Sequence, residues 1–360
     1  RVNSMTTKHL IYILSLIVFL GNSLIINSAN RACVNYIAFD TIKVVSLELF
    51  SLTNYNNNVY LVNISTKDVI KISAGEEDSF VDWSPDGRLI AYKSAYNRPN
   101  LLIYDMQSQR ISEILDGQNT PIFDLNWSPN GQLIAFISTN PDYNQIQHLY
   151  IYQVMNGAIQ NLTPNLDFHA LDINWNPNNI YIVIQVWTPD LDSLYIINIQ
   201  DGQQIILENS FNAQWYEDGR ILRFAKEQDD VVSFYAYDMQ TKTIERLGEE
   251  ARGIRSFDNQ YGAYYQDNLI YIQNLNTGEV EILQSGLSEN YATRFVWSPY
   301  SLEIVFFEPE VDEIETQDGG YIYIKNLETG EVRNALGKYA LYTAPLGDLG
   351  WSPCIEEPES

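Results

Sequence analysis

The segment VDWSPDGRLIAYKS, residues 81–94, combines a tryptophan, a turn signal and a strand-forming run. Pro85 presets φ for a turn, Asp86 tolerates the bridge region and Gly87 accepts a positive φ. The run LIAYKS that follows is rich in the β-branched and aromatic residues that favour strands. The segment therefore predicts two antiparallel strands joined by a tight turn.

The same segment returns along the chain. It reads LNWSPNG at 125–131, INWNPNN at 173–179, AQWYEDG at 213–219, FVWSPYS at 295–301 and LGWSPC at 349–354. The gap before the copy at 295–301 spans about two repeats, and we assign Phe257 in RSFDNQYG as the degenerate copy that fills it. We interpret the repeated aromatic positions as structural, and they are Trp83, Trp127, Trp175, Trp215, Phe257, Trp297 and Trp351.

A second repeat, found independently, has a tyrosine-rich strand, a polar turn and another strand. Examples are LYIYQVMNGAIQNLT at 149–163 and IYIQNLNTGEVEIL at 270–283, and this pattern also occurs seven times. Four strands in a period of about 40–45 residues are typical of a propeller blade. Together the two repeats predict an all-β fold, a seven-bladed β-propeller of four-stranded antiparallel blades.

The ends of the chain predict how this propeller closes. LELFSLT at 47–53 and the strands within 59–73 supply three strands of the first blade, and the segment around Trp351 supplies its first strand. Pairing of the two ends in one blade hides edges that would otherwise stay open. The propeller domain is expected at 46–354, after an N-terminal segment at 30–45 and before an acidic tail at 355–360. VNYIAFDTIKVV at 34–45 is not placed by this scheme and is a candidate extra edge strand.

The N-terminal residues 1–29 resemble a targeting signal. Lys8 and His9 precede the apolar run LIYILSLIVFL at 10–20, and the small residues Ser28 and Ala29 offer a cleavage site. The run is shorter than the roughly 20 residues of a membrane span. An uncleaved signal anchor is the alternative. We expect an exported protein that is periplasmic, displayed on the cell surface or secreted.

The two cysteines, Cys33 and Cys354, lie near opposite ends of the predicted mature chain. In an oxidising compartment this arrangement predicts a disulfide bond across the closure. A lipid-modified Cys33 is a weaker alternative, because Asn30 and Arg31 stand where a lipoprotein signal has apolar and small residues.

The net charge of the chain excludes some classes of binding partner. Asp and Glu number 46 against 21 Lys and Arg, which gives a formal net charge of −25. Such a polyanion repels phosphate backbones and anionic membrane surfaces, so neither nucleic acid nor membrane is an expected partner. Proteins, neutral glycans and divalent cations remain, and we expect a monomer.

The motif WSPDG, followed by IAY or IAF and then a tyrosine-containing strand, resembles the TolB-like propeller repeat, a relative of WD-repeat propellers. The resemblance covers about residues 46–354 and implies the fold. TolB itself carries an additional α/β domain before its propeller, and the short stretch between Cys33 and the first blade strand cannot hold one. The known partner of TolB is therefore not transferred to this chain.

Motifs for catalysis are absent from the sequence. It contains no Gly-x-Ser-x-Gly elbow, phosphate loop, dinucleotide fingerprint or His-Glu-x-x-His. Oligogalacturonate lyases share the repeat and, as the resemblance implies, hold a metal with several histidines. The mature chain has only His148 and His169. We therefore expect no cofactor.

Loop variation predicts a working face. In a four-stranded meander, the turns after strands one and three lie on one side, and the loops that vary in length and chemistry lie on the other. The acidic loop at 307–320 suggests either a calcium site or a solvated loop, and without calcium-loop spacing we favour the latter. Loop aromatics suggest either ligand stacking or strand-end packing. The candidate binding residues are Tyr96, Tyr143, His148, Trp187, Glu308, Glu310 and Asp312.

These observations favour a non-catalytic function. The leading hypothesis is an exported scaffold that binds a protein or a glycan on its variable loops. The alternative is a carbohydrate-active enzyme, a hydrolase or lyase, whose Asp and Glu side chains meet in the central funnel.

Overall fold

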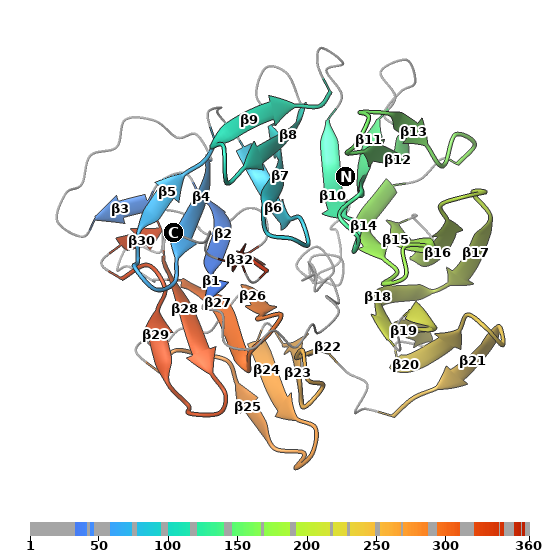
Figure 1. The fold of residues 1–360 in the computed structure, drawn as a ribbon. Helices are drawn as coiled ribbons and strands as arrows, with labels where there is room; N and C mark the ends of the chain where they lie inside the picture. Colours follow the sequence, from blue (N-terminus) through green and yellow to red (C-terminus); the bar gives the residue numbers. More distant parts are fainter. Residues whose placement is uncertain are drawn as a thin grey trace, which may run out of the picture.

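The computed structural model describes residues 33–41, 44–46, 58–73, 78–94, 100–115, 121–139, 146–166, 169–187, 192–216, 219–228, 231–248, 253–267, 269–286, 294–309, 320–337, 339–341, 349–353 and 355–356. These residues form seven four-stranded antiparallel blades arranged in a ring (Figure 1). No α-helix occurs in these ranges. The predicted seven-bladed β-propeller is therefore confirmed.

Blades 2 to 4 each consist of four strands that are consecutive in the chain. Blade 2 contains β6 (Asp78–Trp83), β7 (Leu89–Ser94), β8 (Asn100–Asp105) and β9 (Arg110–Glu113). Blade 3 contains β10 (Ile122–Trp127), β11 (Leu133–Thr139), β12 (Gln147–Gln153) and β13 (Ile159–Asn161). Blade 4 contains β14 (His169–Trp175), β15 (Tyr181–Trp187), β16 (Ser193–Asn198) and β17 (Gln204–Glu208).

Blades 5 to 7 repeat this arrangement. Blade 5 contains β18 (Ser210–Tyr216), β19 (Ile221–Gln228), β20 (Val231–Asp238) and β21 (Thr243–Arg246). Blade 6 contains β22 (Ile254–Arg255), β23 (Tyr261–Gln266), β24 (Leu269–Asn274) and β25 (Val280–Ile282). Blade 7 contains β26 (Arg294–Trp297), β27 (Glu303–Pro309), β28 (Gly320–Asn326) and β29 (Val332–Asn334).

Blade 1 closes the ring with strands from both ends of the chain. Its order is β31 (Gly350–Trp351), β2 (Tyr36–Thr41), β4 (Asn58–Asn63) and β5 (Val69–Lys71). Ile37 lies opposite Trp351, and Ala38 lies opposite Gly350. The predicted closure is confirmed, because a C-terminal strand completes a blade that the N-terminal strands begin.

The second strand of blade 1 differs from the prediction. It is β2, within the stretch that the repeat pattern left unplaced, and residues 47–53 lie outside the described ranges. Ile37, Ala38 and Phe39 are all fully buried, as expected for a strand covered on both faces. Neither the tyrosine pattern nor the turn pattern of the repeat occurs in β2. The sequence signal for this strand was its short continuous apolar run.

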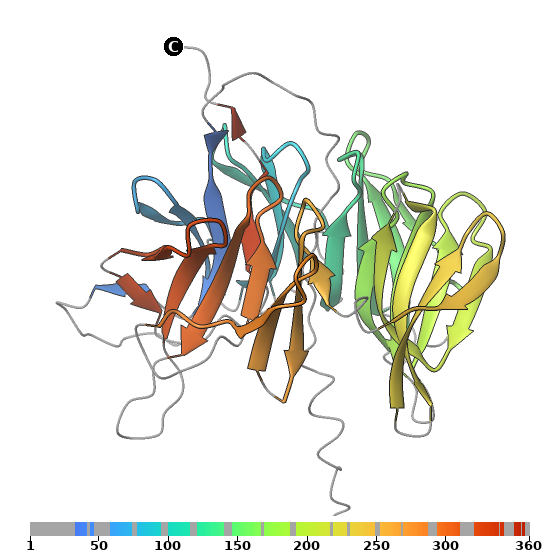
Figure 2. The ribbon, with the colours of Figure 1, turned by 90° about the horizontal axis from the view of Figure 1, so that it is seen from below.

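The N-terminal residues pair with the rest of the chain at two further places. β3 (Val44–Ser46) pairs with β30 (Tyr339–Leu341), which in turn pairs with β28 of blade 7. β1 (Cys33–Val34) pairs with β32 (Ile355–Glu356), and these short strands project from one face of the ring in the edge-on view (Figure 2). The unplaced stretch therefore contains an extra edge strand as well as the second strand of blade 1.

The core is divided among the interfaces between blades. Six hydrophobic clusters join neighbouring blades in pairs, for example Ala91 and Leu101 of blade 2 with Leu125 and Trp127 of blade 3. The inner-strand tryptophans of all blades except blade 6 pack toward the preceding blade. Burial of an aromatic side chain of this size stabilises an interface by several kcal/mol, of the order of 3.

The indole groups also connect consecutive inner strands. The Nε1 of Trp175 donates a hydrogen bond of 3.1 Å to the carbonyl of Asn126, the residue before the tryptophan of the preceding blade. Trp215 donates in the same way to Asn174 at 3.3 Å, and Trp83 to Gly350 at 3.3 Å. The repeated tryptophan therefore combines apolar packing with a directional contact between blades.

The aromatic position of blade 6 needs a correction. In blade 3, Ser128 follows the tryptophan and its N–H donates to the carbonyl of Leu133. The N–H of Ser256 makes the same bond to Tyr261, so Arg255 occupies the tryptophan position and Phe257 occupies the proline position. Phe257 is 38% exposed. The sequence assigned Phe257 to the tryptophan position because it is aromatic. The strand register instead aligns Ser256 with Ser128, which puts Arg255 at the tryptophan position.

Candidate functional site

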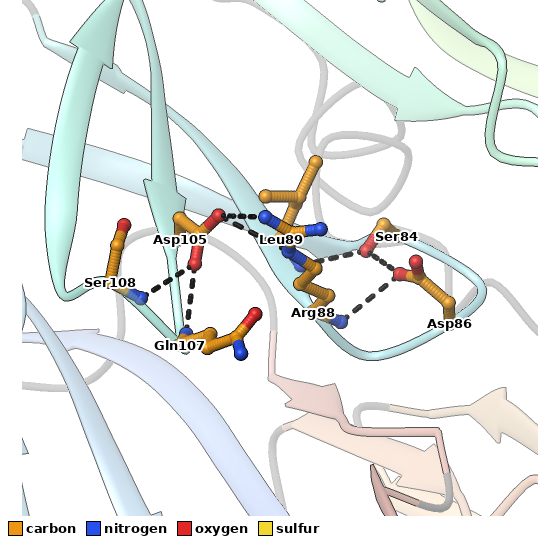
Figure 3. A network of polar contacts seen from close by, with 7 residues as sticks. All are labelled: Ser84, Asp86, Arg88, Leu89, Asp105, Gln107 and Ser108. Carbon is orange, nitrogen blue, oxygen red and sulfur yellow. Dashed lines mark hydrogen bonds and ion pairs between the residues drawn. The ribbon is translucent and has the colours of Figure 1, made fainter.

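The two faces of the ring differ in how their polar groups are used. We call the side with the turns after strands one and three the turn face, and the opposite side the loop face. On the turn face of blade 2, the Ser84 hydroxyl donates to Asp86 Oδ1 at 2.6 Å, and the Arg88 N–H donates to the same oxygen at 3.0 Å (Figure 3). Gly87 has φ of 70°, as the turn signal predicted.

The second turn of blade 2 is organised by Asp105. Its Oδ1 accepts hydrogen bonds from the N–H groups of Gln107 and Ser108, and its Oδ2 accepts one from Arg88 at 2.8 Å (Figure 3). The Ser108 N–H contributes most to lowering the pKa of this carboxyl, and Arg88 assists. Asp238 and Arg220 repeat the pair in blade 5 at 2.6 Å. These carboxylates hold their own turns, so the turn face is organised for structure.

Four of the predicted binding residues cannot be placed on the loop face. Tyr96, Tyr143, Glu310 and Asp312 lie outside the described residues. The other three, His148, Trp187 and Glu308, are described, and they have different environments.

His148 is buried, in contrast to the exposed loop position that was expected. It is 6% exposed, and its Nδ1 lies 2.8 Å from the carbonyl oxygen of Thr163. The hydroxyl of Thr163 accepts a hydrogen bond from the Leu149 N–H at 2.8 Å. The ring also contacts Tyr150 edge to face. His148 therefore holds the outer strands of blade 3 together, and its strand position buries it.

Glu308 is likewise buried rather than part of an exposed acidic loop. It is 2% exposed, and its two carboxylate oxygens accept hydrogen bonds of 2.8 Å from the N–H and the hydroxyl of Ser285. Ser285 belongs to the connection from blade 6 to blade 7. Glu308 therefore ties this connection to β27, because a buried carboxylate requires such donors.

Trp187 keeps an exposed surface at the loop face. It ends β15, and its register partner is His169, the first residue of β14. Trp187 is 38% exposed and His169 is also exposed. In blade 3, Phe123 near the start of β10 is 41% exposed. Blades 3 and 4 thus present exposed aromatic side chains at the loop-face end, Phe123 on the inner strand β10 and Trp187 on the second strand β15.

Phe123 and His169 were not identified as site residues from the sequence. A register shift between Ile122 and Asp124 places Phe123 at a β-bulge in the inner strand. Comparable shifts occur in β6, β14 and β18, so the inner strands of blades 2 to 5 share this irregularity. Bulges re-aim side chains next to binding sites and at rims. The sequence signal was weak, because one extra residue does not disturb the tryptophan spacing visibly.

Two carboxylates occupy equivalent positions just after these bulges. Asp124 of β10 and Asp172 of β14 lie three residues before their tryptophans, and each is 7% exposed. Both also interact with other groups of the protein.

Among the described residues, no group of three or more His, Cys, Asp or Glu side chains is arranged to hold a metal ion. The same part of the chain contains no helix long and apolar enough to cross a membrane.

No protein-family model matches this sequence, and no curated protein is significantly similar to it. Solved structures are similar in fold. Oligogalacturonate lyase from Vibrio parahaemolyticus aligns with a TM-score of 0.58 and 14% identity, over 77% of this chain and 85% of that chain. The β-propeller domain of the Trilobed protease from Pyrococcus furiosus aligns with a TM-score of 0.57 and 15% identity, over 83% and 94%.

TolB from Acinetobacter baumannii aligns with a TM-score of 0.48 and 15% identity, over 88% of this chain and 83% of that chain. Identities this low establish the propeller fold and nothing finer. The resemblance to the TolB-like repeat therefore rests on the WSPDG motif and its spacing. A lyase and a protease domain share the architecture, so function has to be argued from surfaces.

Proposed function

We propose that this chain is an exported, non-catalytic β-propeller that binds a protein or a glycan through its loop face. The observation that carries the proposal is the exposed Trp187 beside His169, with Phe123 on the neighbouring blade. Exposed aromatic side chains at a rigid strand end offer a surface that stacks on sugar rings or anchors a protein. The turn face also exposes an aromatic residue, Phe257 in the turn after β22, but carboxylates such as Asp86 and Asp105 on that face hold their own turns.

Binding is tested with the mature domain on a glycan array and in a cross-linking pull-down. The variants are Trp187→Ala and Phe123→Ala, with Ile206→Ala as the matched control. Ile206 is 49% exposed and lies on the outer strand of blade 4, away from the inner strands. We expect at least about a tenfold loss of affinity for the aromatic variants and none for the control. Equal binding by all three variants would exclude this surface.

A second set of variants, in the acidic loop at 307–320, tests which class of partner binds. Glu310→Gln and Asp312→Asn remove charge without changing size, whereas Glu308→Gln perturbs the contact with Ser285. A cationic protein partner predicts weaker binding for the first two variants with unchanged stability. A neutral glycan predicts no change for them. These two variants therefore distinguish a cationic protein partner from a neutral glycan.

A carbohydrate-active enzyme is the second candidate. It is favoured by Asp124 and Asp172, which occupy equivalent positions on neighbouring inner strands of the channel. Two carboxylates near one another are what acid–base cleavage of a sugar linkage needs. The binding function is preferred because both carboxylates are buried and interact within the protein. Turnover of an oligosaccharide panel that is abolished by Asp124→Asn and Asp172→Asn would reverse this preference.

Export is part of the proposal and rests on residues 1–29, which lie outside the described residues. Expression of the full chain in bacteria, followed by cell fractionation and N-terminal sequencing, tests it. We expect mature protein that begins near residue 30 in the periplasm or medium. Full-length protein retained in the cytosol would contradict the proposal.

A further inference from the structure

A groove with a volume of about 340 Å³ lies between the outer parts of blades 3 and 4, and we call it the outer groove. One wall is the end of β13 with the connection that follows it, residues 160–166, and the other is the turn from β16 to β17, residues 200–204. A Cβ on Gly202 would lie 3.7 Å from the carbonyl oxygen of Leu162, so the walls approach closely. Figure 1 shows β13 and β17 on the outer side of the ring in neighbouring blades. The volume is typical of ligand pockets, which range from about 300 to 1,000 Å³.

The blade 4 wall of the outer groove is polar because blade 4 departs from the repeat. In every blade a row of register partners runs from the tryptophan position of the inner strand to the outer strand. In blade 4 this row is Trp175, Ile182, Ile197 and Gln204. In the other six blades the row ends in valine or isoleucine, namely Val69, Ile111, Ile159, Ile244, Val280 and Val332. Gln204 therefore replaces an aliphatic side chain by an amide.

Gln160 occupies the facing wall, on blade 3. Its register partner is Ile151, and the register partner of Gln204 is Ile197. Both isoleucines belong to the hydrophobic cluster that joins blades 3 and 4. Directly opposite residues share one face of a sheet, so both glutamines extend from the faces that these two blades turn toward each other. The outer groove is therefore the polar, outward continuation of a buried apolar interface.

Hydrogen bonds within the protein fix both walls. Asn161 Oδ1 accepts a hydrogen bond of 2.8 Å from the Thr163 N–H, and the Thr163 hydroxyl accepts one from β12. Across the groove, Asn198 Oδ1 accepts a hydrogen bond of 2.8 Å from the Gln200 N–H. The groove is therefore formed before a ligand binds, which lowers the entropy cost of binding.

Other amide side chains of the outer groove remain available to a ligand. Gln160, Asn165, Gln200 and Gln204 are exposed, and within the described part of the chain their side chains make no hydrogen bond to the protein. Each amide offers two donors and a carbonyl acceptor. Among the residues that line the groove, all of which are described, Asp201 carries the single charge. The groove therefore presents donors and acceptors together, with no cation.

This chemistry matches a neutral, hydroxyl-rich ligand. A sugar hydroxyl donates and accepts hydrogen bonds at the same time, as a side-chain amide does. The faces of a sugar ring carry C–H groups, and Leu162, Pro164 and Leu166 supply apolar atoms in the same groove. An acidic sugar would meet Asp201 without a cation to balance its charge.

An extended peptide fits the outer groove less well than a sugar. The groove opens between two sheet faces, where side chains project, whereas strand N–H and C=O groups lie in the plane of each sheet. A peptide that binds by adding a strand needs an exposed sheet edge. Recognition in this groove therefore depends on side chains.

We propose that the outer groove between blades 3 and 4 binds a short segment of a neutral glycan, with Gln160, Gln200 and Gln204 as hydrogen-bonding residues. The site uses neither Trp187 nor Phe123. It therefore goes beyond the loop-face surface and does not rest on the proposed function.

The test is calorimetric titration of the purified protein with three neutral trisaccharides, namely cellotriose, maltotriose and triacetylchitotriose. Trigalacturonic acid and the peptide Gly-Ser-Gly are the comparison solutes. Gln204→Ile is the key variant, because it restores the type of residue that the other blades carry. Gln200→Ala is the second variant, with Gln240→Ala as its matched control. Gln240 is exposed at the same place in the turn from β20 to β21, where its N–H donates to Asp238 Oδ1 at 2.8 Å.

We expect saturable binding of at least one neutral trisaccharide by the wild type and by Gln240→Ala. Affinity should be at least about tenfold lower in Gln204→Ile and in Gln200→Ala. Thermal unfolding should show that Gln204→Ile is at least as stable as the wild type, which separates a lost contact from a lost fold. If Gln204→Ile does not fold, the comparison of Gln200→Ala with Gln240→Ala decides.

Three results would each overturn the proposal. They are no saturable binding of any of the three trisaccharides by the wild type at about 10 mM, binding by both groove variants equal to the wild type, and preference for trigalacturonic acid or for the peptide. Binding that is lost in Trp187→Ala but kept in both groove variants would assign the glycan to the loop face. That result would support the proposed function and exclude the outer groove, so the two proposals can fail separately.

Discussion

The two interfaces of blade 6 have the same strand register but different side chains, apolar toward blade 7 and polar toward blade 5. Toward blade 7, Trp297 is fully buried in an apolar cluster and its Nε1 donates to the Ile254 carbonyl at 3.0 Å. Toward blade 5, Arg255 replaces the tryptophan and contacts Tyr216 instead. Both inner strands keep the register of the repeat. Backbone geometry is therefore set by the repeat, whereas a few side chains decide whether an interface is apolar and buried or polar.

This difference has a consequence for stability. A ring of blades is held by all of its interfaces, because each blade contacts only its two neighbours. An interface without an apolar cluster lacks most of the burial that stabilises the others. The interface between blades 5 and 6 is therefore expected to be the least stable.

The largest effect should come from truncating a tryptophan at a sealed interface. Trp297→Ala removes a fully buried side chain and is expected to lower the free energy of unfolding by about 3–5 kcal/mol. Arg255→Ala, at the equivalent position of blade 6, should cost only about 1 kcal/mol, because its side chain is partly exposed. Urea denaturation of both variants measures the difference. Equal losses would show that the polar interface is as strong as the apolar one.

The next effect concerns the closure of the ring. β1 pairs with β32 so that Cys33 lies opposite Glu356, two residues after Cys354 in the sequence. Cys354 itself lies outside the described residues, and the disulfide stays a prediction. If the bond forms, reduction or Cys33→Ser should lower the free energy of unfolding by about 2–4 kcal/mol. Recovery of both thiols as free groups in exported protein, by non-reducing mass mapping, would contradict it.

A smaller effect is expected at the turns of the two blades that flank the polar interface. Gly278 in blade 6 has φ of 78° with no atom near its missing Cβ, so Gly278→Ala should cost about 1 kcal/mol through backbone strain alone. Lys242 occupies the equivalent turn of blade 5 with φ of 58°. Lys242→Gly should stabilise the protein by up to about 1 kcal/mol.

Thermal unfolding measures both turn variants. Their effects should be independent of Arg255→Ala, since each turn joins the two outer strands of its blade, whereas Arg255 lies on the inner strand β22. Strong coupling in a double-mutant cycle would show that the turns and the interface form one cooperative unit.

The smallest effect is the pH dependence of the turn face. The folded-state pKa of Asp105 lies below its ordinary value, because the Ser108 N–H and Arg88 favour the charged form. Its contribution to stability is present above the unfolded pKa of about 3.9 and is lost as pH falls through the folded pKa. Asp105→Asn should therefore flatten the acid side of the stability profile slightly. A profile identical to wild type below about pH 4 would mean that the contact contributes nothing.

Much of the fold was predictable because its signals are local and repeated. Ser84–Pro85–Asp86–Gly87 specifies a turn through φ preferences, and the alternation around each tryptophan specifies paired strands. The number of copies then fixes the number of blades. The stretch that contains β2 was predicted only as an extra edge strand. Its place inside blade 1 was not predicted, because it lacks both repeat motifs and its place is set by its partners Trp351 and Val62.

The candidate sites were less predictable, because burial depends on neighbours far away in the chain. His148 and Glu308 are polar residues at strand ends, which suggested exposure. Their partners Thr163 and Ser285 bury them, and the sequence holds no local sign of those contacts. Trp187, at the end of β15, is the described candidate that stays exposed, at 38%.

The strand–turn unit, its sevenfold repetition and the pairing of the chain ends could be read from the sequence, since each depends on local backbone preference or on counting. Which copies deviate together became visible in the folded ring alone. Tyr216, Arg223 and Arg255 are separate irregularities along the chain, and they come together because the ring brings blade 5 against blade 6. A contact between blades is set by three-dimensional packing, which no linear spacing encodes.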